Sequence, residues 1–300
     1  MQEQQDDSNK ITSKYFPTLK KLFSTKFNLR KFFKNLFIII LVLTVISFWC
    51  EQIWLYTSDD AWEDNNYTNE ENHPESCNVS GILLCGELVT FADEDGKYLQ
   101  TSSEDIVYSI EEAEMDDKIK AIFLEVDSYG GGPVADEEVA NALKRATKPT
   151  VVLIRTAGLS SAYYASTGAD VIFASQDSDV GSIGVTMSYI DNSKQNKAEG
   201  LTFNSISSGI YKDITNTDKP LTYGEKELLM RDIKIMNENF IEAVAENRNL
   251  DIDKVRAMAD GSSMLGKMAL ENGLIDKIGG MYEVEDYLKE KIGEEIQICW

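Results

Sequence analysis

Short apolar runs alternate with amphipathic segments between residues 79 and 174, and this alternation limits the folds that the chain can adopt. Apolar runs rich in branched side chains are typical of buried strands, whereas apolar residues spaced three or four apart indicate helices. We expect strands at 79–84, 119–126, 150–155 and 171–174, separated by helices at 104–115, 134–146 and 162–168. Such an alternation predicts an α/β fold with a largely parallel sheet and flanking helices.

The C-terminal part of the chain is predicted to be helical. Thr222 and Glu225 have the spacing of a capping box, and a helical pattern continues from there to about Asn247. Two or three shorter helices are expected between Asp253 and Lys291. The 300 residues leave room for a domain of roughly 200 residues with a sizeable core.

An uncharged apolar run, Leu36–Cys50, precedes this domain. The run is shorter than the roughly 20 residues of a typical membrane-spanning helix, but Lys34 before it and Trp54 after it suit the two membrane interfaces. We predict a transmembrane anchor over residues 36–56. A cleaved signal peptide is the alternative, and it fits less well because a long leader precedes the run and no small-residue cleavage site follows it.

The distribution of charge predicts the orientation of this anchor. Eight lysines and arginines lie between Lys10 and Lys34, and none follows the run until Lys97. Because basic flanks stay in the cytoplasm, residues 1–35 are expected inside the cell. Residues 57–78 then form an acidic linker, and residues 79–300 form an extracytoplasmic domain. The chain is thus predicted to be a single-pass protein of the cell membrane, in contact with lipid through residues 36–56.

Composition excludes several classes of function. A net charge of -22 argues against a nucleic-acid partner, because polyanion binding needs a basic face. The one histidine, His73, lies in the acidic linker, so a Ser-His-Asp triad would have to use it and a two-histidine zinc site is impossible. No metal or organic cofactor is expected.

The four cysteines form no Cys-x-x-Cys pair, which argues against a structural zinc site. Cys77 and Cys85 flank the first predicted strand. An extended chain would hold them too far apart for a disulfide, so they are expected either to be unpaired thiols or to pair across a turn.

A glycine-rich segment, residues 126–133 (VDSYGGGP), follows a predicted buried strand and precedes a helix. Glycines at this position would let backbone amides face a bound oxyanion just before the N-terminus of a helix. A tight turn or a phosphate-binding loop also fits the spacing. No Gly-Lys-Ser/Thr follows, however, which disfavours a nucleotide-binding P-loop.

Two further segments contain candidate catalytic side chains. Ser160 and Ser161 follow the third predicted strand and open a helix, which is the position of a nucleophile elbow. The Gly-x-Ser-x-Gly pattern is missing, and helix capping is the alternative role for these serines. Lys212 lies in a loop rich in Gly, Ser and Thr, and it is either a solvated surface charge or, if desolvated enough to be neutral, a general base.

These motifs occur in the order Asp-Ser-x-Gly-Gly-Gly, Ser-x-x-Tyr-Tyr, Asp-x-Gly-Ser-Ile-Gly-Val and Ser-Gly-x-Tyr-Lys-Asp-Ile. Together with Ala-Asp-Gly-Ser and Gly-Leu-Ile-Asp-Lys-Ile-Gly further on, they resemble the signal peptide peptidase A (protease IV) family over about residues 79–285. The resemblance implies a crotonase/Clp protease-like fold, an N-terminal membrane anchor and a Ser-Lys dyad. Carried over by motif, the nucleophile falls on Ser160, the general base on Lys212, the oxyanion donors on Gly130, Gly131 and Ser161, and a hydrogen-bond partner that orients the lysine on Ser182.

The resemblance also implies a reaction and partners. It indicates a serine endopeptidase without cofactor, assembled as a homo-oligomer, that degrades remnant signal peptides or other exposed apolar peptides at the membrane. The chain departs from the family pattern at Tyr129, where proline is usual, and at Ser161-Ala162, where two glycines are usual, so Ser161 is a rival nucleophile. The alternatives are a catalytically weak or silent peptide-binding membrane scaffold, and an acyl enzyme that acts on a substrate other than a peptide.

Overall fold

The structure is a computed structural model that describes residues 77–93 and 97–300, together with a few positions between 34 and 47. The chain divides into two compact units, residues 1–72 and 73–300. In the described part of the chain, no helix is both long enough and apolar enough to cross a membrane. The anchor predicted at 36–56 and the acidic linker with His73 lie largely outside the described residues, and both stay predictions.

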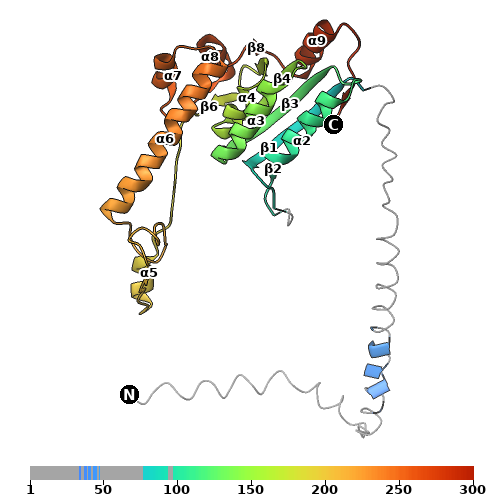
Figure 1. Ribbon diagram of the computed structural model, residues 1–300. Coiled ribbons are helices and arrows are strands. Elements are labelled where there is room, and N and C mark those ends of the chain that lie inside the picture. Colours follow the sequence, from blue (N-terminus) through green and yellow to red (C-terminus); the bar gives the residue numbers. More distant parts are fainter. Residues whose placement is uncertain are drawn as a thin grey trace, which may run out of the picture. The chain divides into compact units, whose positions relative to one another are not determined.

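A largely parallel sheet forms the centre of the second unit (Figure 1). The main strand order is β2-β1-β3-β4-β5-β8, and neighbours along it run parallel. The short β6 continues beside β4 and pairs antiparallel with β7, while β9 pairs with β1. The bounds are β1 Val79–Val89, β2 Gln100–Ser102, β3 Ala121–Gly131, β4 Thr150–Leu159, β5 Val171–Ala174, β6 Asp179–Gly181, β7 Ser263–Leu265, β8 Lys277–Ile278 and β9 Ile298–Cys299.

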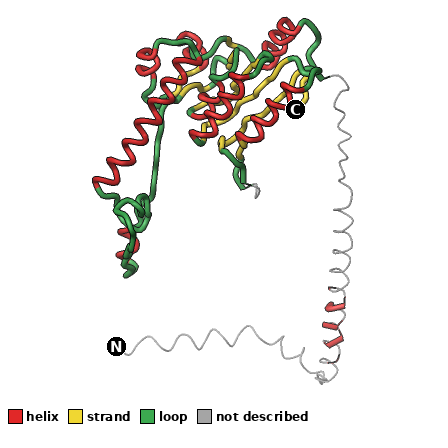
Figure 2. The backbone as a smooth tube through the Cα atoms, viewed as in Figure 1, coloured by secondary structure: helices red, strands yellow, loops and turns green. Residues whose placement is uncertain are grey.

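Helices pack on both faces of this sheet. Figure 2 shows α2 (Ser103–Met115), α3 (Pro133–Arg145) and α4 (Ser161–Ser166) in red in front of the yellow strands, and α9 (Met281–Ile292) packs on the other face. In β3, Ile122 and Leu124 enter a core that they share with helices α2, α3 and α4. The side chain between them, Phe123, belongs to a second core with Leu288 of α9. Because successive side chains of a strand point to opposite faces, a strand buried on both faces needs an almost continuous apolar run. The predicted α/β fold with a largely parallel sheet is confirmed.

The C-terminal part is helical, as predicted. Helix α6 begins after Thr222, whose Oγ1 accepts from the Glu225 amide at 3.3 Å, while the Glu225 Oε2 accepts from the Thr222 amide at 2.8 Å. This pair of hydrogen bonds is the predicted capping box. The helix bounds are α2 Ser103–Met115, α3 Pro133–Arg145, α4 Ser161–Ser166, α5 Ser193–Ala198, α6 Tyr223–Asn247, α7 Ile252–Met258, α8 Gly266–Asn272 and α9 Met281–Ile292.

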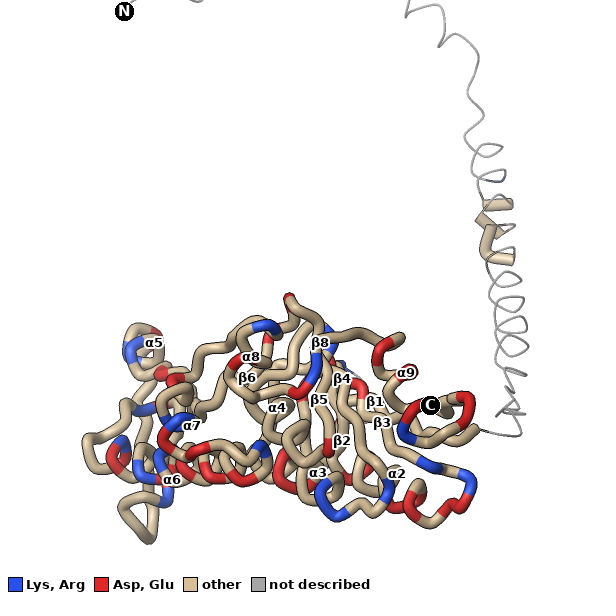
Figure 3. Tube along the Cα trace, turned by 90° about the horizontal axis from the view of Figure 1, so that it is seen from above, with Lys and Arg blue, Asp and Glu red and all other residues tan. Residues whose placement is uncertain are grey.

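Residues 185–222, here called the arm, run outward from the sheet region, pass through α5 and end at the start of α6, and α6 brings the chain back (Figures 1 and 2). The arm consists mainly of loop and turn residues. Helix α5 carries two lysines and no acidic residue, whereas α6 carries residues of both signs (Figure 3). Along this path the arm extends one end of the unit beyond the sheet (Figure 1).

Three strands run further than the sequence predicted, and one of them is β1, which continues past residue 84 to Val89. Strand β3 continues past its predicted end at Val126 and through the glycines to Gly131, because Gly131 pairs in register with Leu88 of β1. A Cβ at Gly131 would lie 1.9 Å from the Leu88 carbonyl oxygen, so only glycine allows this approach. Strand β4 likewise continues to Leu159 and ends directly at Ser160.

Both expectations for Cys77 are wrong, because it forms a disulfide with Cys299. Strand β9 pairs with the start of β1, with Ser80 opposite Cys299, and this brings the C-terminus beside Cys77. Cys85 is a free, half-buried thiol further along β1, and the extended strand holds it away from Cys77.

Candidate active site

Ser160 lies at the junction between β4 and α4 in a strained backbone conformation. Its φ of 52° and ψ of -126° are uncommon for a residue with a Cβ. Two hydrogen bonds hold the turn: the Ser160 amide donates to the Gly181 carbonyl at 2.8 Å, and the Tyr164 amide donates to the Ser160 carbonyl at 2.9 Å. A strand, a sharp turn and a helix in this order form a nucleophile elbow, which exposes the serine at the carboxyl edge of the sheet.

The glycine-rich segment passes directly beside the Ser160 side chain. Gly130 has a φ of 120°, and a Cβ there would lie 2.9 Å from the Ser160 Cβ and 3.4 Å from its Oγ. A side chain at this position would therefore be strained by the backbone and would collide with the serine. The structure thus brings together Ser160 and the segment predicted to bind an oxyanion.

The predicted oxyanion donors differ in their present hydrogen bonds. The Gly130 amide donates to the Ser128 Oγ at 3.1 Å. Ser161 is the first residue of α4, so its amide has no partner inside that helix. The Ser161 hydroxyl donates to the Gly131 carbonyl at 3.1 Å. The Ser161 amide therefore has no hydrogen-bond acceptor within α4, as its predicted role of oxyanion donor requires.

Ser160 lines an open cavity of about 830 Å³ between the sheet edge and the middle of α6. Tyr129, 73% exposed, stands on its rim, and Lys234 of α6 also lines it. Ser182 lies in the same cavity, with its hydroxyl donating to the Gly261 carbonyl at 3.0 Å. The lining residues are Tyr129, Ser160, Ser182, Gly184, Val185, Thr186, Ile233, Lys234, Asn237, Glu238, Ala259, Asp260 and Gly261.

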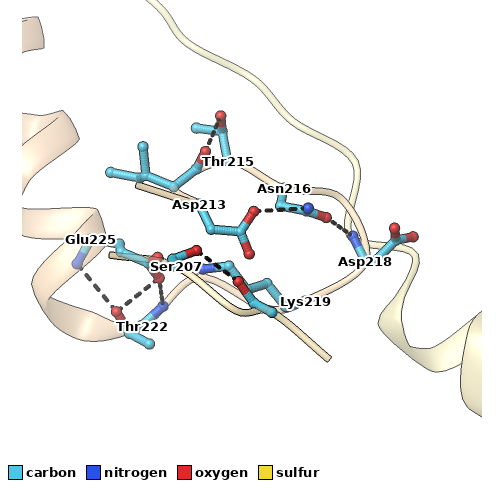
Figure 4. Close-up of polar contacts among 10 residues, drawn as sticks. Ser207, Asp213, Thr215, Asn216, Asp218, Lys219, Thr222 and Glu225 are labelled. Atoms are coloured by element: carbon cyan, nitrogen blue, oxygen red, sulfur yellow. Dashed lines mark hydrogen bonds and ion pairs between the residues drawn. The ribbon is translucent and has the colours of Figure 1, made fainter. Parts of the chain in front are cut away.

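Lys212 lies elsewhere, on the arm. It is exposed and is not among the residues that line the Ser160 cavity. The loop around it is held by local polar contacts, which Figure 4 shows. The Asn216 Nδ2 donates to the Asp213 Oδ1 at 3.0 Å, and Lys219 forms an ion pair with Glu225 in the first turn of α6. A hydrogen bond from Lys219 lowers the pKa of Glu225 to about 2. Within the described chain, Lys212 and Ser160 therefore belong to separate parts of the unit.

Two residues of this region were not singled out from the sequence. Lys234 is the lysine in the cavity lining, and nothing in its sequence context distinguishes it from a surface charge. Asp136 is buried in the first turn of α3 behind Ser161. Its position on the same helical face as the buried Val139 and Ala140 was the signal that could have identified it, since a carboxyl group rarely occupies such a face.

A model of peptidase family S49 matches residues 142–294, just over half of the chain. The chain belongs to peptidase family S49. The matched range includes Ser160, Ser182 and Lys212 and begins after the glycine-rich segment. The resemblance to signal peptide peptidase A inferred from the motifs is thereby confirmed, and the protein is a serine peptidase.

Three relatives agree with this S49 assignment. The chain is 33% identical over 264 residues to a protein of Methanocaldococcus jannaschii named as a protease, covering 86% of this chain and 82% of the relative. It is 30% identical over 217 residues to an Enterococcus faecium protein named as the signal peptide peptidase SppA, covering 71% and 62%. It is 28% identical over 192 residues to the chloroplastic serine protease SPPA of Arabidopsis thaliana, covering 63% and 28%. The chain thus spans less than two thirds of the second and third relatives.

Proposed function

We propose that this S49 peptidase is a membrane-anchored endopeptidase in which Ser160 is the nucleophile. The observation that carries this proposal is the strained turn at Ser160, which faces a glycine that has no room for a side chain. Strained backbone at a turn persists only where the surrounding structure maintains it, and such turns cluster at active sites. The Ser161 hydroxyl is engaged with Gly131, which favours Ser160 over its neighbour as the nucleophile.

We further propose that the general base is Lys212 of a neighbouring copy of the chain. Two features of the arm support this. Lys212 is exposed there rather than in the Ser160 cavity, and apolar side chains of the arm are exposed as well, with Ile206 fully exposed and Ile210 82% exposed. Exposed apolar groups concentrated on one extended segment indicate a surface that a partner covers. A head-to-tail homo-oligomer would bring the arm of one copy to the cavity of the next.

The reaction then proceeds by acyl transfer. The neutral amine of Lys212 accepts the hydroxyl proton of Ser160 as its Oγ attacks the carbonyl carbon of a peptide bond. Amides of the glycine-rich segment and of Ser161 stabilise the negative oxygen that forms. The protonated lysine gives its proton to the departing amine, and the C–N bond breaks. Water then attacks the acyl-enzyme by the same proton transfers, which releases the carboxylic acid and restores both residues.

The proposed location is the outer side of the cell membrane, with residues 36–56 as the anchor. The Cys77–Cys299 disulfide supports this location, because disulfides persist in oxidising compartments outside the cytoplasm. Substrates are proposed to be remnant signal peptides or other apolar peptides released at the membrane. The rim residue Tyr129, mostly exposed, offers an aromatic surface to such chains.

A mixing experiment tests the dyad and its division between two copies. Ser160→Ala and Lys212→Met chains are each expected to be inactive on a quenched fluorescent peptide of apolar sequence. In random mixed oligomers, about a quarter of the interfaces would combine an intact Ser160 with an intact Lys212, so co-expression should restore roughly that share of activity. If a mixture stays inactive although both chains co-assemble, the dyad lies within one chain.

Two further variants serve as controls for the identity of the base. Lys212→Arg should be as inactive as Lys212→Met, because a guanidinium group stays protonated and cannot accept the serine proton. Lys234→Met removes the lysine of the Ser160 cavity and should still cleave the reporter peptide. An inactive Lys234→Met together with an active Lys212→Met would assign the base to Lys234 instead.

A further inference from the structure

Asp136 is a buried carboxyl group behind the proposed nucleophile. It lies in the first turn of α3 with 4% of its surface exposed, and its Oδ1 has no hydrogen-bond partner among the described residues. The Asp136 amide donates to the Gly132 carbonyl at 3.3 Å, which fixes this turn to the end of the glycine-rich segment. Burying a polar group without a partner costs stability, so packing alone does not account for an aspartate here.

Ser161 connects Asp136 to the site. The Ser161 side chain is 5% exposed, and its Oγ donates to the Gly131 carbonyl at 3.1 Å. Burial raises the pKa of the Asp136 carboxyl, and hydrogen bonding from this same hydroxyl opposes the rise. A serine hydroxyl can donate one hydrogen bond and accept two. The Gly131 carbonyl and an ionised Asp136 carboxylate therefore compete for the one hydrogen that the Ser161 hydroxyl can donate. The neighbours of this contact, Ser160 and Gly130, are the residues that meet in the active site.

The surroundings of Asp136 favour its neutral form. Burial raises the pKa of this carboxyl to about 7, and hydrogen bonds from Ser161 and from the Glu137 amide oppose the shift only in part. The charged and titratable groups that face it are Glu137 on its own helix, Tyr164 on α4 and, next to Tyr164, Glu246 on α6. None of these groups is a cation. Burial raises the pKa of Tyr164 to about 12, so Tyr164 stays neutral at physiological pH.

We propose that Asp136 is a positioning residue of the peptidase: through the Ser161 hydroxyl it holds the start of α4 against Gly131 and thereby sets the distance between Ser160 and the oxyanion donors. A protonated Asp136 can donate to the Ser161 Oγ and so leaves the Ser161 hydrogen to the Gly131 carbonyl, which is the hydrogen bond that the structure shows. An ionised Asp136 can only accept, so it withdraws that hydrogen and loosens the contact. The inference rests on the proposed role of Ser160, and it adds that the activity of Ser160 depends on whether Asp136 is protonated.

The test compares pH profiles of kcat/KM for the full chain in detergent, with the quenched apolar peptide as substrate. Asp136→Asn cannot ionise, and its amide nitrogen can still donate to the Ser161 Oγ. The ratio of Asp136→Asn activity to unmodified activity should therefore rise severalfold between pH 6 and pH 8, roughly the range around the pKa of about 7. Glu137→Gln removes a negative charge from the next, exposed position of the same helix; because that charge raises the pKa of Asp136, this variant should move the profile to slightly lower pH but, unlike Asp136→Asn, keep its pH dependence.

A double variant shows whether Asp136 acts through Ser161. In a Ser161→Ala chain, the Asp136→Asn substitution should no longer change the pH profile, because the shared hydroxyl is gone. A flat ratio for Asp136→Asn alone, or a ratio that still rises in the Ser161→Ala chain, would overturn the inference while Ser160→Ala stays inactive. If Ser160→Ala itself remained active, the proposed function would be wrong instead.

The stability of the protein supplies a second measurement. The folded carboxyl, with its pKa raised from 3.8 to about 7, binds more protons than the unfolded one in this range, so the free energy of unfolding falls as the pH rises from about 4 to about 7. Asp136→Asn should lack this contribution. The melting temperature of the variant minus that of the unmodified chain should therefore increase as the pH rises over the same range. If Asp136→Asn does not fold, Asp136→Ser, which keeps a neutral donor, takes its place in both experiments. Equal pH dependence of melting in both chains would contradict a buried, titrating Asp136.

Discussion

Single residues in the active site are constrained more by their neighbours than by their own chemistry. Ser160 adopts an uncommon φ of 52°, and the space beside it is free because residue 130 has no side chain. A serine in a relaxed turn would present its Oγ in a different direction. The chemistry of the site therefore depends on a glycine that takes no chemical part in the reaction.

We predict that Gly130→Ala will lower kcat/KM at least tenfold. The added methyl group would meet the Ser160 Cβ at 2.9 Å, and a φ of 120° costs a residue with a Cβ on the order of 1–3 kcal/mol. Cleavage of the apolar reporter peptide and labelling of Ser160 by a fluorophosphonate would both measure the loss.

Gly132→Ala is the matched control for this substitution. A Cβ there has the Leu88 carbonyl oxygen as its nearest neighbour, at 3.8 Å, and the backbone does not require glycine. The control should retain nearly normal activity and stability. Equal loss in both variants would indicate a general sensitivity of the glycine-rich segment rather than a steric limit at Ser160.

Helix α6 is the element that joins the arm to the catalytic unit. Its first turn is fixed by the capping box of Thr222 and Glu225 and by the ion pair of Glu225 with Lys219. Its C-terminal half packs into the main core through Phe240, Ile241 and Val244. The helix therefore connects the arm to the main core. Its first turn lies outside that core and is held mainly by these polar contacts.

We predict that Thr222→Ala will lower the free energy of unfolding by about 1 kcal/mol, because it removes the side-chain acceptor at the N-cap. Urea denaturation followed by circular dichroism would measure this difference. Thr222→Ser keeps the oxygen and should differ little from the unmodified chain. If serine and alanine were equally destabilising, the methyl group of Thr222 would be responsible rather than the cap.

At the level of the whole molecule, the two ends of the described domain are joined covalently. The Cys77–Cys299 disulfide closes a segment with a sequence separation of 222 residues, and β9 adds backbone pairing to β1 at the same place. Phe123 of the second core packs against Trp300 with ring centroids 5.6 Å apart. The start of the domain is thus stabilised by residues at the very end of the sequence.

We predict that Cys299→Ser will lower the free energy of unfolding by about 2–5 kcal/mol, which is typical for the loss of a native disulfide. Denaturation with and without reductant would measure it, and reductant should have no further effect on the variant. Cys85→Ser removes the free thiol of β1 and serves as the control. Mass spectrometry of chain purified under thiol-blocking conditions would also test the location, because free Cys77 and Cys299 thiols would contradict an extracytoplasmic domain.

The sequence alone predicted the α/β class, the central strands and helices and the capping box of α6, because these depend on local patterns. Buried strands require apolar runs, and Thr222 with Glu225 caps a helix through contacts only three residues apart. The ordered motifs around Ser160 and Lys212 were enough to predict the peptidase family. The short strands β2 and β6 to β9 escaped prediction, because two or three residues carry no periodicity.

Only the tertiary structure decided how distant residues meet. The partner of Cys77 depends on the pairing of β9 with β1, which no spacing in the sequence reveals. The burial of Asp136 depends on α3 packing against α4, and the separation of Lys212 from Ser160 depends on the path of the arm. Local patterns record how a segment prefers to fold, whereas these contacts result from the burial of apolar surface across the whole chain, which has no signature at any one position.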